Sequence, residues 1–508
     1  MPIRIYNSMT RRKETFEPLE KGKISFYLCG PTVYDYFHIG NARCWVIFDV
    51  IRRYLESRGN DVTYIVNLTD VDDKIIARAR ESDQTAEELA EFFIEAFFAD
   101  CKNLGIQSAT RYPRATQHIP QMIDLITSLI DKGHAYAVDG DVFFAVGSFP
   151  EYGRLSNKKL EDLVAGHRVA VDSRKQSPAD FALWKTAKPG EPFWESPWGQ
   201  GRPGWHIECS AMSMEYLGKT FDIHAGAEDL IFPHHENEIA QSRCGADAAF
   251  ARYWMHLKFL NFDKQKMSKS LGNVYTVREV LKEISAQALR YFFLQEHYRK
   301  PMEMASETFW QILKGAQSAV NRLGRTYQNL SRYLERVGFT EQQKDLTGFV
   351  GGKAAAIERA MDDDFNSAGA LGSLFELSKW VNEHLEADNN PPLDALMMAK
   401  QVFEDIDQYM GILPVQSESA ETAGLEQVAA LVREVISQWP DVPGVAPLQP
   451  LVADQNAALS HLMDGLLTLR QELRRQKDWT RTDYLRDRLQ EFGFVLEDGS
   501  GSTRWRHA

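Results

Sequence analysis

Long apolar runs are missing from this sequence of 508 residues: no stretch approaches the roughly 18 uncharged apolar residues that a membrane-spanning helix needs. Basic residues near the N-terminus are not followed by an apolar segment, so no secretory signal is expected. Cysteine is scarce, and an odd number of free thiols without an export signal speaks against a disulfide framework. The five cysteines are Cys29, Cys44, Cys101, Cys209 and Cys244. We therefore expect a cytoplasmic protein that has no membrane partner and can use some cysteines for metal binding or catalysis.

Basic residues are fewer than acidic ones, 58 Lys and Arg against 71 Asp and Glu, which gives a formal net charge of −13. A protein that coats nucleic acid without sequence preference depends on Lys and Arg, so this function class is disfavoured, whereas RNA recognition through local basic patches stays open. The composition, 44% hydrophobic and 25% charged, is ordinary for a folded protein. At this length, roughly two to four domains are expected.

The first part of the chain has the pattern of a nucleotide-binding sheet. Residues 24–29 form a short apolar run that ends at Gly30-Pro31, residues 41–57 have apolar side chains at helical spacing, and residues 62–68 resemble a second strand. Strand, helix and strand at this spacing predict a βαβ unit of a parallel sheet. Further helices are predicted at 86–104, 119–132, 283–295, 307–335, 352–361 and 367–384. The chain is thus predicted to change from α/β to nearly all-helical beyond residue 277.

The end of the chain has a different composition. Pro, Ser, Ala and Gln accumulate at 413–456, which indicates a linker or a poorly packed insertion, with a helix at 425–436 as an alternative for part of it. Helices at 457–476 and 480–492 and a strand-like tail follow. Residues 470–488 contain seven basic and four acidic side chains, a local excess of positive charge in an acidic chain.

Two separate segments suit the binding of a polyphosphate. The loop after the first strand contains His-Ile-Gly-Asn at 38–41 and leads into a helix, whose free N–H groups and positive dipole end favour phosphate. His38 can donate a hydrogen bond, and Gly40 permits close approach of a ligand. Far downstream, Lys266-Met-Ser-Lys269-Ser places two lysines among small residues. Each segment alone is also compatible with an ordinary helix cap or a solvated loop.

A third group of residues has the chemistry of a metal site. His234 and Glu238 are four residues apart, so on a helix they share a face and can bind one ion. Cys29 and Cys209 could complete a tetrahedral set around Zn²⁺, and His235 is a rival ligand on geometry alone. The alternative is that both cysteines are small buried hydrophobic residues.

Taken together, these motifs resemble a known family. His-Ile-Gly-Asn and Lys-Met-Ser-Lys-Ser resemble the "HIGH" and "KMSKS" motifs of class I aminoacyl-tRNA synthetases, although Asn41 stands where that family has its second His. The segments at 29–35, 204–210 and 232–238, with those at 67–74 and 362–366, resemble the cysteinyl-tRNA synthetases within that class. The resemblance covers the chain from about residue 23 to its end.

The resemblance implies a fold and a domain plan. It implies an α/β protein with a Rossmann-type parallel-sheet catalytic domain, an α-helical bundle and a small C-terminal α/β tail domain. Expected boundaries are 1–276 for the catalytic domain with a zinc site and an inserted connective region, 277–412 for the tRNA-stem-binding bundle, 413–456 for the linker and 457–508 for the anticodon-binding region. Residues 288–295 resemble the "DALR" element. Trp505 is a candidate for stacking on a base; the alternative is that Trp479 and Trp505 are core residues.

The resemblance also implies an activity: cysteine is activated with ATP to cysteinyl-adenylate and pyrophosphate, and is then transferred to the 3′ end of tRNA(Cys). One Zn²⁺ ion would select the substrate thiolate, Mg²⁺ would accompany ATP, and the enzyme would be a monomer. The implied catalytic residues are His38, Lys266 and Lys269, and the implied zinc ligands are Cys29, Cys209, His234 and Glu238. The implied ATP-binding residues are Thr32, His38, Gly40, Asn41, Lys266, Ser268 and Lys269. The implied substrate-binding residues are Thr69, Trp205, His224 and Asp229.

Two departures and two alternatives accompany this interpretation. Asn41 cannot carry a proton, and Ala225 and Ala227 stand where relatives tend to have glycine, which reduces backbone freedom near the substrate. A ligase that passes cysteine from the adenylate to an amino-sugar would share the zinc set and both ATP motifs, but such ligases are shorter. A non-catalytic RNA-binding paralogue would not need the two lysines and four metal ligands.

Overall fold

The computed structural model describes residues 1–159, 173–263, 265–266, 274–337, 348–386, 393–414, 418–453, 459–498 and 503–507. The chain divides into two compact units, Met1–Leu413 and Pro414–Ala508. No helix within the described ranges is both long enough and apolar enough to cross a membrane.

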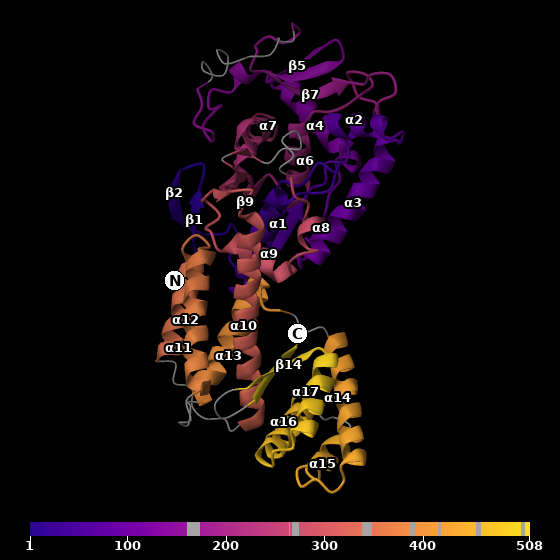
Figure 1. Ribbon diagram of the computed structural model, residues 1–508. Helices are drawn as coiled ribbons and strands as arrows, with labels where there is room; N and C mark the ends of the chain where they lie inside the picture. Colours follow the sequence, from indigo (N-terminus) through magenta and orange to yellow (C-terminus); the bar gives the residue numbers. More distant parts are fainter. Residues whose placement is uncertain are drawn as a thin grey trace. The chain divides into compact units, whose positions relative to one another are not determined.

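A four-stranded parallel sheet lies at the centre of the first unit (Figure 1). Its strands, in spatial order, are β10 (Phe250–Leu257), β9 (Thr220–Ala227), β3 (Lys23–Leu28) and β4 (Asp61–Val66). The chain runs outward from β3 to β4 in one direction and from β9 to β10 in the other. The strand order therefore reverses between β3 and β9, and at such a point the loops after the two strands leave a crevice for a ligand.

Helices cover both faces of this sheet because side chains alternate along its strands. Phe26 and Leu28 of β3 belong to the apolar core beneath α1, whereas Tyr27 and Cys29 belong to the core beneath α6 and α7. These helices and their neighbours are α1 (Ile39–Ser57), α2 (Asp73–Glu81), α3 (Ala86–Asn103), α4 (Ile119–Asp131), α6 (Trp205–Leu217) and α7 (Glu236–Ala246). The βαβ unit predicted from the sequence is confirmed as β3, α1 and β4.

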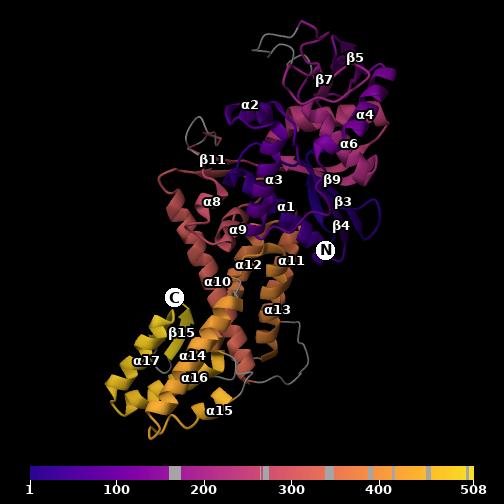
Figure 2. The ribbon, with the colours of Figure 1, turned by 90° about the vertical axis from the view of Figure 1, so that its right-hand side faces the viewer.

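An antiparallel sheet is inserted between α4 and α6, a feature that the apolar pattern does not indicate. Its strands are β5 (Ala135–Val138), β6 (Asp141–Phe144), β7 (Phe181–Thr186) and β8 (Gly201–Pro203). Smaller sheets are formed by β1 (Arg4–Asn7) with β2 (Arg12–Thr15), and by β11 (Leu260–Phe262) with β12 (Gln265–Lys266) and β13 (Met302–Met304). Figure 2 shows β5 and β7 beside α4, away from the central sheet.

The helical part of the first unit shares one continuous apolar core with α1 and the sheet. Its helices are α8 (Val277–Val280), α9 (Ala286–Leu294), α10 (Phe309–Val337), α11 (Phe349–Asp362), α12 (Ser367–Glu386) and α13 (Leu393–Met410). A buried Arg290 on α9 donates to Asp49 of α1 at 2.8 Å and to the Met410 carbonyl at 2.7 Å. This side chain joins three helices, and it stands in the segment that resembles the "DALR" element.

The second unit corrects the expectation of a poorly packed insertion at 413–456. Most of that segment is helical, as α14 (Glu418–Gln438) and α15 (Leu448–Ala453). Val428, Leu431 and Val435 are buried against α16 (Leu459–Arg475) and α17 (Trp479–Glu491). Prolines beyond residue 439 dominated the composition, whereas 418–438 is rich in the good helix formers Ala, Glu and Leu.

The chain ends in the antiparallel pair β14 (Phe494–Asp498) and β15 (Thr503–His507). Trp505 is buried, with its ring 5.5 Å from that of Phe494, whereas the Trp479 side chain is 55% exposed. Trp505 therefore belongs to the core of this unit, and the expectation that it stacks on an RNA base is wrong for this structure. Of the two tryptophans, Trp479 is the one whose ring is accessible.

Candidate metal centre and nucleotide pocket

A pocket of about 340 Å³ opens at the carboxyl ends of β3, β9 and β10. Cys29 and the loop that follows it form one wall, and the residues after β9 and β10 form the opposite wall. Of the residues predicted from the sequence, those on the pocket are Cys29, Thr32, His38, Gly40, Asn41, Trp205 and Asp229. The structure therefore brings the first phosphate motif and part of the expected substrate site into one cavity.

His38 caps the helix that begins at this pocket. Its Nδ1 accepts a hydrogen bond from the backbone N–H of Asn41 at 3.3 Å, as the N-cap of α1. A neutral imidazole that accepts at Nδ1 carries its proton on Nε2, which makes Nε2 a donor. The side chain of Asn41 is exposed at the helix start. The sequence-based expectation that His38 donates to a phosphate is compatible with this arrangement.

The second phosphate motif is only partly within the described structure. The backbone of Lys266 pairs with Asn261 as the edge of the small sheet of β11 and β12. Ser268 and Lys269 lie outside the described residues, as does the side chain of Lys266. Their expected contacts with ATP remain predictions.

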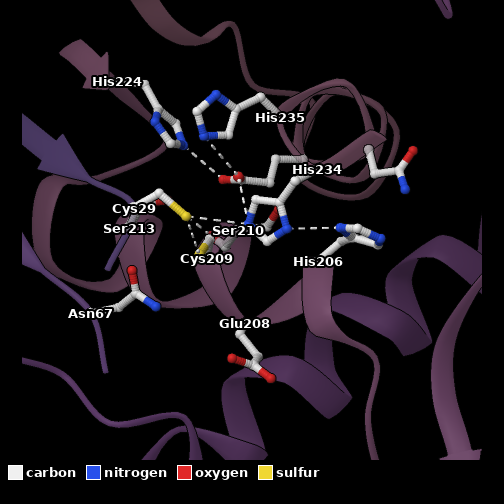
Figure 3. A network of polar contacts seen from close by, with 12 residues as sticks. Cys29, Asn67, His206, Glu208, Cys209, Ser210, Ser213, His224, His234 and His235 are labelled. Carbon is white, nitrogen blue, oxygen red and sulfur yellow. Dashed lines mark hydrogen bonds and ion pairs between the residues drawn. The ribbon is translucent and has the colours of Figure 1, made fainter. Parts of the chain in front are cut away.

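Four side chains converge from separate segments: Cys29 follows β3, Cys209 stands in α6, His234 in η4 (Ile231–His235) and Glu238 in α7. Figure 3 shows Cys29, Cys209 and His234 facing one another. All four ligand atoms lie within 4.8 Å of one another, and all four side chains are buried. Cys29 Sγ is 3.6 Å from Cys209 Sγ and 3.4 Å from His234 Nε2, and His234 Nε2 is 3.3 Å from Glu238 Oε1. Three of the six edges of a tetrahedron are thereby defined.

These distances can be compared with those that a zinc ion imposes. Bond lengths of about 2.3 Å to sulfur and about 2.0–2.1 Å to nitrogen or oxygen give tetrahedral edges of about 3.8 Å for S–S, about 3.5 Å for S–N and about 3.3 Å for N–O. The observed separations match these edges within a few tenths of an ångström. Glu238 Oε1 is in addition a buried oxygen without a hydrogen-bond donor among the described residues. The four residues therefore fit a Zn²⁺ ion.

Burial opposes charge on these ligands when no cation is bound. It raises the pKa of Cys209 and of Glu238 well above their ordinary values, and it lowers the pKa of His234 well below its ordinary value. A divalent cation reverses this preference for the thiol and the carboxyl, because it stabilises their deprotonated forms. The site is thus electrostatically complementary to a cation.

Histidines that sequence reasoning did not single out surround the ligand set. His206 Nδ1 lies 2.9 Å from His234 Nδ1, on the side of the ring opposite the cysteines. A proton on His234 Nδ1 would leave Nε2 as the metal-facing atom, which is how outer hydrogen bonds usually orient a ligating imidazole. His206 stands within the segment at 204–210, but nothing in its spacing predicts that it contacts His234.

A second set, His224, His235 and Glu238, could also hold an ion. Here His224 Nε2 is 2.8 Å from Glu238 Oε2, and His235 Nδ1 is 2.9 Å from His256 Nε2. His256 Nδ1 continues to Ser8 Oγ at 2.8 Å. The imidazoles of His235 and His256 thus connect the Glu238 carboxylate to Ser8, in the turn between β1 and β2.

The expected substrate residues divide into two groups. Trp205 begins α6, is 37% exposed, and has its ring 4.4 Å from that of His234; like Asp229 it lines the pocket. Thr69 and His224 are buried behind the described pocket wall. Thr69 donates to Glu208 Oε2 at 2.7 Å, a partner that the sequence did not suggest. Contact of Thr69 and His224 with substrate stays a prediction.

Known proteins are similar in sequence to this chain along its whole length. A sequence model described as the tRNA synthetases class I (C) catalytic domain matches residues 15–314, which is more than half of the chain. The Cysteine--tRNA ligase of Desulfitobacterium hafniense is 47% identical over 514 aligned residues that cover 99% of each chain. The chain belongs to the cysteine--tRNA ligase family of class I synthetases. The Cysteine--tRNA ligase of Symbiobacterium thermophilum is 46% identical and covers 100% of each chain.

Two further sequence models match later parts of the chain. A DALR domain model matches residues 356–414, and a model of the cysteinyl-tRNA ligase anticodon binding domain matches residues 456–506. The DALR match lies downstream of the segment at 288–295 that resembles the element of that name.

Solved structures share the fold at low sequence identity. The Agrobacterium radiobacter LeuRS–tRNA–LeuAMS complex has a TM-score of 0.57 at 11% identity and covers 78% of this chain and 85% of that one. Mycobacterium tuberculosis methionyl-tRNA synthetase has a TM-score of 0.54 at 16% identity and covers 86% and 96%. The prediction of a Rossmann-type class I fold with a helical bundle is confirmed.

Proposed function

We propose that this chain is a cysteine--tRNA ligase, which couples cysteine, ATP and tRNA(Cys). The observation that carries the proposal is the position of Cys29, which lines the pocket and also belongs to a buried ligand set of zinc-like dimensions. Full-length similarity to Cysteine--tRNA ligases supports the same reaction.

In the first step, a carboxylate oxygen of cysteine attacks the α-phosphorus of ATP, and pyrophosphate leaves. Positioning and charge stabilisation dominate such chemistry. The N-terminal N–H groups of α1 and the Nε2–H of His38 would bind the α-phosphate. Lys266 and Lys269 would neutralise the leaving pyrophosphate, and Mg²⁺ would accompany ATP. Thr32, Gly40, Asn41 and Ser268 are proposed to hold the remainder of ATP.

In the second step, a ribose hydroxyl at the 3′ end of tRNA attacks the carbonyl carbon of the adenylate, and AMP leaves. Trp205 and Asp229 line the cavity. Trp205 is proposed to close the pocket over the amino acid, and the Asp229 carboxylate is proposed to accept a hydrogen bond from its ammonium group. Thr69 and His224 would support the same pocket from behind.

Selection of cysteine over serine is proposed to depend on Zn²⁺ held by Cys29, Cys209, His234 and Glu238. When bound there, the ion supplies a soft Lewis acid that lowers the pKa of a thiol and binds the thiolate in preference to a hydroxyl. An apolar pocket alone would discriminate by only about 1–3 kcal/mol.

The expected domain plan is proposed in the same terms except at 413–456: a catalytic domain at 1–276, a tRNA-binding bundle at 277–412 and an anticodon-binding region at 457–508. The helices α14 and α15 of 413–456 belong to the same compact unit as the last region. The anticodon-domain match at 456–506 supports the anticodon-binding region. A cytoplasmic location and a monomeric state are proposed with it.

The test is ATP-dependent attachment of labelled cysteine to unfractionated tRNA, with serine in parallel. Charging by cysteine and not by serine is expected. If cysteine drives exchange of pyrophosphate into ATP but no tRNA is charged, the amino-sugar ligase is the better interpretation.

A further inference from the structure

Arg43 is fully buried in the second turn of α1, the helix that His38 caps. A charged side chain is rarely buried to this extent unless an opposite charge accompanies it. Among the described residues, however, the hydrogen bonds of Arg43 go only to main-chain carbonyls and none goes to a carboxylate. The guanidinium therefore holds backbone segments in place and does not neutralise an acidic side chain.

The carbonyls that Arg43 binds belong to two separate segments. Nη1 donates to the carbonyl of Lys258 at 2.6 Å and to that of Phe259 at 3.1 Å, in the segment that follows β10. Nη2 donates to the carbonyl of Lys300 at 3.0 Å and to that of His297 at 3.5 Å, in the segment between α9 and β13. Because a guanidinium is a rigid planar fork, one side chain fixes both segments against α1.

The first of these segments is part of the pocket wall. Residues 258–260 line the pocket on one side, and Gly40 lines it at the start of α1. Arg43 stands behind this wall and does not line the pocket itself. The chain continues from residue 260 through β11 and β12 to Lys266. In the proposed reaction ATP lies between the start of α1 and this wall, so the guanidinium sets the separation of two surfaces that must both contact the nucleotide.

Other hydrogen bonds fix the same segment from its remaining sides. The N–H of Lys258 donates to the Tyr298 carbonyl at 3.0 Å. The N–H of Phe259 donates to Glu228 Oε1 at 3.0 Å. The main-chain polar groups of both residues thus have partners within the protein, and Arg43 supplies the ones that connect them to α1.

We propose that Arg43 is a positioning residue for ATP, which sets the distance between the start of α1 and residues 258–260 without touching the nucleotide. The inference rests on the proposed function and deepens it. Without the guanidinium, the carbonyls of Lys258 and Phe259 lose their donors in a buried place, and the segment is expected to shift toward other donors. Trp205 and the metal ligands make none of these contacts, so cysteine and zinc binding should change little.

The test measures cysteine-dependent pyrophosphate exchange, which needs no tRNA, in Arg43→Met. This variant retains a long side chain but has no donor. KM for ATP is expected to rise about tenfold, whereas kcat should stay within about threefold and KM for cysteine within about twofold of wild type. Binding of labelled ATP in equilibrium dialysis, without cysteine, should weaken by a similar factor. Zinc content should remain one per chain.

A conservative variant and a matched control separate positioning from stability. Arg43→Lys keeps the charge but carries its donors on one nitrogen, so it can hold one segment and not both, and KM for ATP should rise only about threefold. Arg53→Met is the control, since the Arg53 side chain lies on the same helix and is 11% exposed. It donates to Asp49 and to the Gly105 carbonyl, and none of these residues lines the pocket. This variant should lower the midpoint of thermal unfolding, as Arg43→Met does, and leave KM for ATP unchanged.

The outcomes that would overturn the inference are specific. An unchanged KM for ATP in both Arg43→Met and Arg43→Lys would leave Arg43 a purely structural residue. An equal rise of KM for ATP in Arg53→Met would attribute the effect to lost stability alone. If Arg43→Met does not fold, KM and dialysis with Arg43→Lys decide by the same criterion. If the wild-type protein shows no cysteine-dependent exchange, it is the proposed function that fails.

Discussion

Two possible metal sites share one carboxylate, and they differ in kind. Glu238 offers Oε1 to the set with Cys29, Cys209 and His234, and its Oε2 lies against His224 in the set with His235. The first set has zinc-like edges and touches the pocket through Cys29. The second set consists of hydrogen-bonded imidazoles behind it.

The comparison shows how one buried carboxylate, that of Glu238, can take part in both sets. In the second set, the His224 pKa is lowered to about 3 by burial, so this ring is neutral and acts as a hydrogen-bond partner of Glu238. Outer partners of this kind orient a ligand without binding the ion. We therefore assign the ion to the first set and support of Glu238 to the second.

The largest effect is expected from removal of a ligand in the first set. Cys209→Ser replaces a soft donor by a hard one, so bound zinc should fall from one per chain to a small fraction, and cysteine-dependent pyrophosphate exchange should fall at least about a hundredfold. Elemental analysis and exchange assays measure both. Cys244→Ser, at a buried cysteine of α7, is the control and should keep its zinc. Full zinc content and activity in Cys209→Ser would show that the first set is not the site.

Metal removal should be coupled to proton uptake. Without a cation, burial raises the pKa of Cys209 and Glu238; for Cys29 the hydrogen bond with Cys209 lowers the pKa, while burial and Glu238 raise it by more. The two thiols are then protonated near neutral pH and must lose their protons when zinc binds, and burial shifts the pKa of Glu238 in the same direction. We expect release of up to about three protons per ion, and zinc binding that weakens as pH falls. Calorimetry in buffers of different ionisation enthalpy measures this number, and zinc binding without proton release would contradict the assignment.

A smaller effect is expected from the second set. His224→Gln removes the imidazole that faces Glu238 Oε2, so zinc should remain at one per chain but bind about 10–100-fold more weakly. Competition with a chromophoric chelator measures the dissociation constant. Loss of zinc as complete as in Cys209→Ser would make His224 a ligand rather than a supporting group.

The smallest effect is expected at the end of the imidazole chain. Ser8 is separated from Glu238 by His256 and His235. Ser8→Ala should therefore change zinc affinity by less than about threefold, because one neutral hydrogen bond contributes roughly 0.5–1.5 kcal/mol and acts here only through two rings. A larger change in zinc affinity in the same chelator assay would mean that Ser8, His256 and His235 together position Glu238.

Some of this architecture can be predicted from local patterns. The βαβ unit and the positions of His38 and Gly40 follow from apolar spacing and from a helix start. The i, i+4 relation of His234 and Glu238 places both on one side of the chain even though His234 precedes the first regular turn of α7. In these cases the deciding interactions are close in sequence.

The rest depends on contacts between distant segments. Cys29 and Cys209 meet only because α6 returns beneath β3 after the inserted antiparallel sheet, and no spacing rule predicts such a return. His235 meets His256 because β9 and β10 are neighbours in the sheet. At 418–438, average composition concealed a helix whose apolar side chains find their core only against α16. The family resemblance, rather than spacing, is what joined the two cysteines in the sequence-based expectation.

The assignment of the ion to the first set is tested most directly by X-ray absorption at the zinc edge of the purified protein. Two sulfur neighbours at about 2.3 Å and two nitrogen or oxygen neighbours at about 2.0–2.1 Å are expected. A shell of nitrogen and oxygen alone would place the ion between His224, His235 and Glu238 and would contradict it.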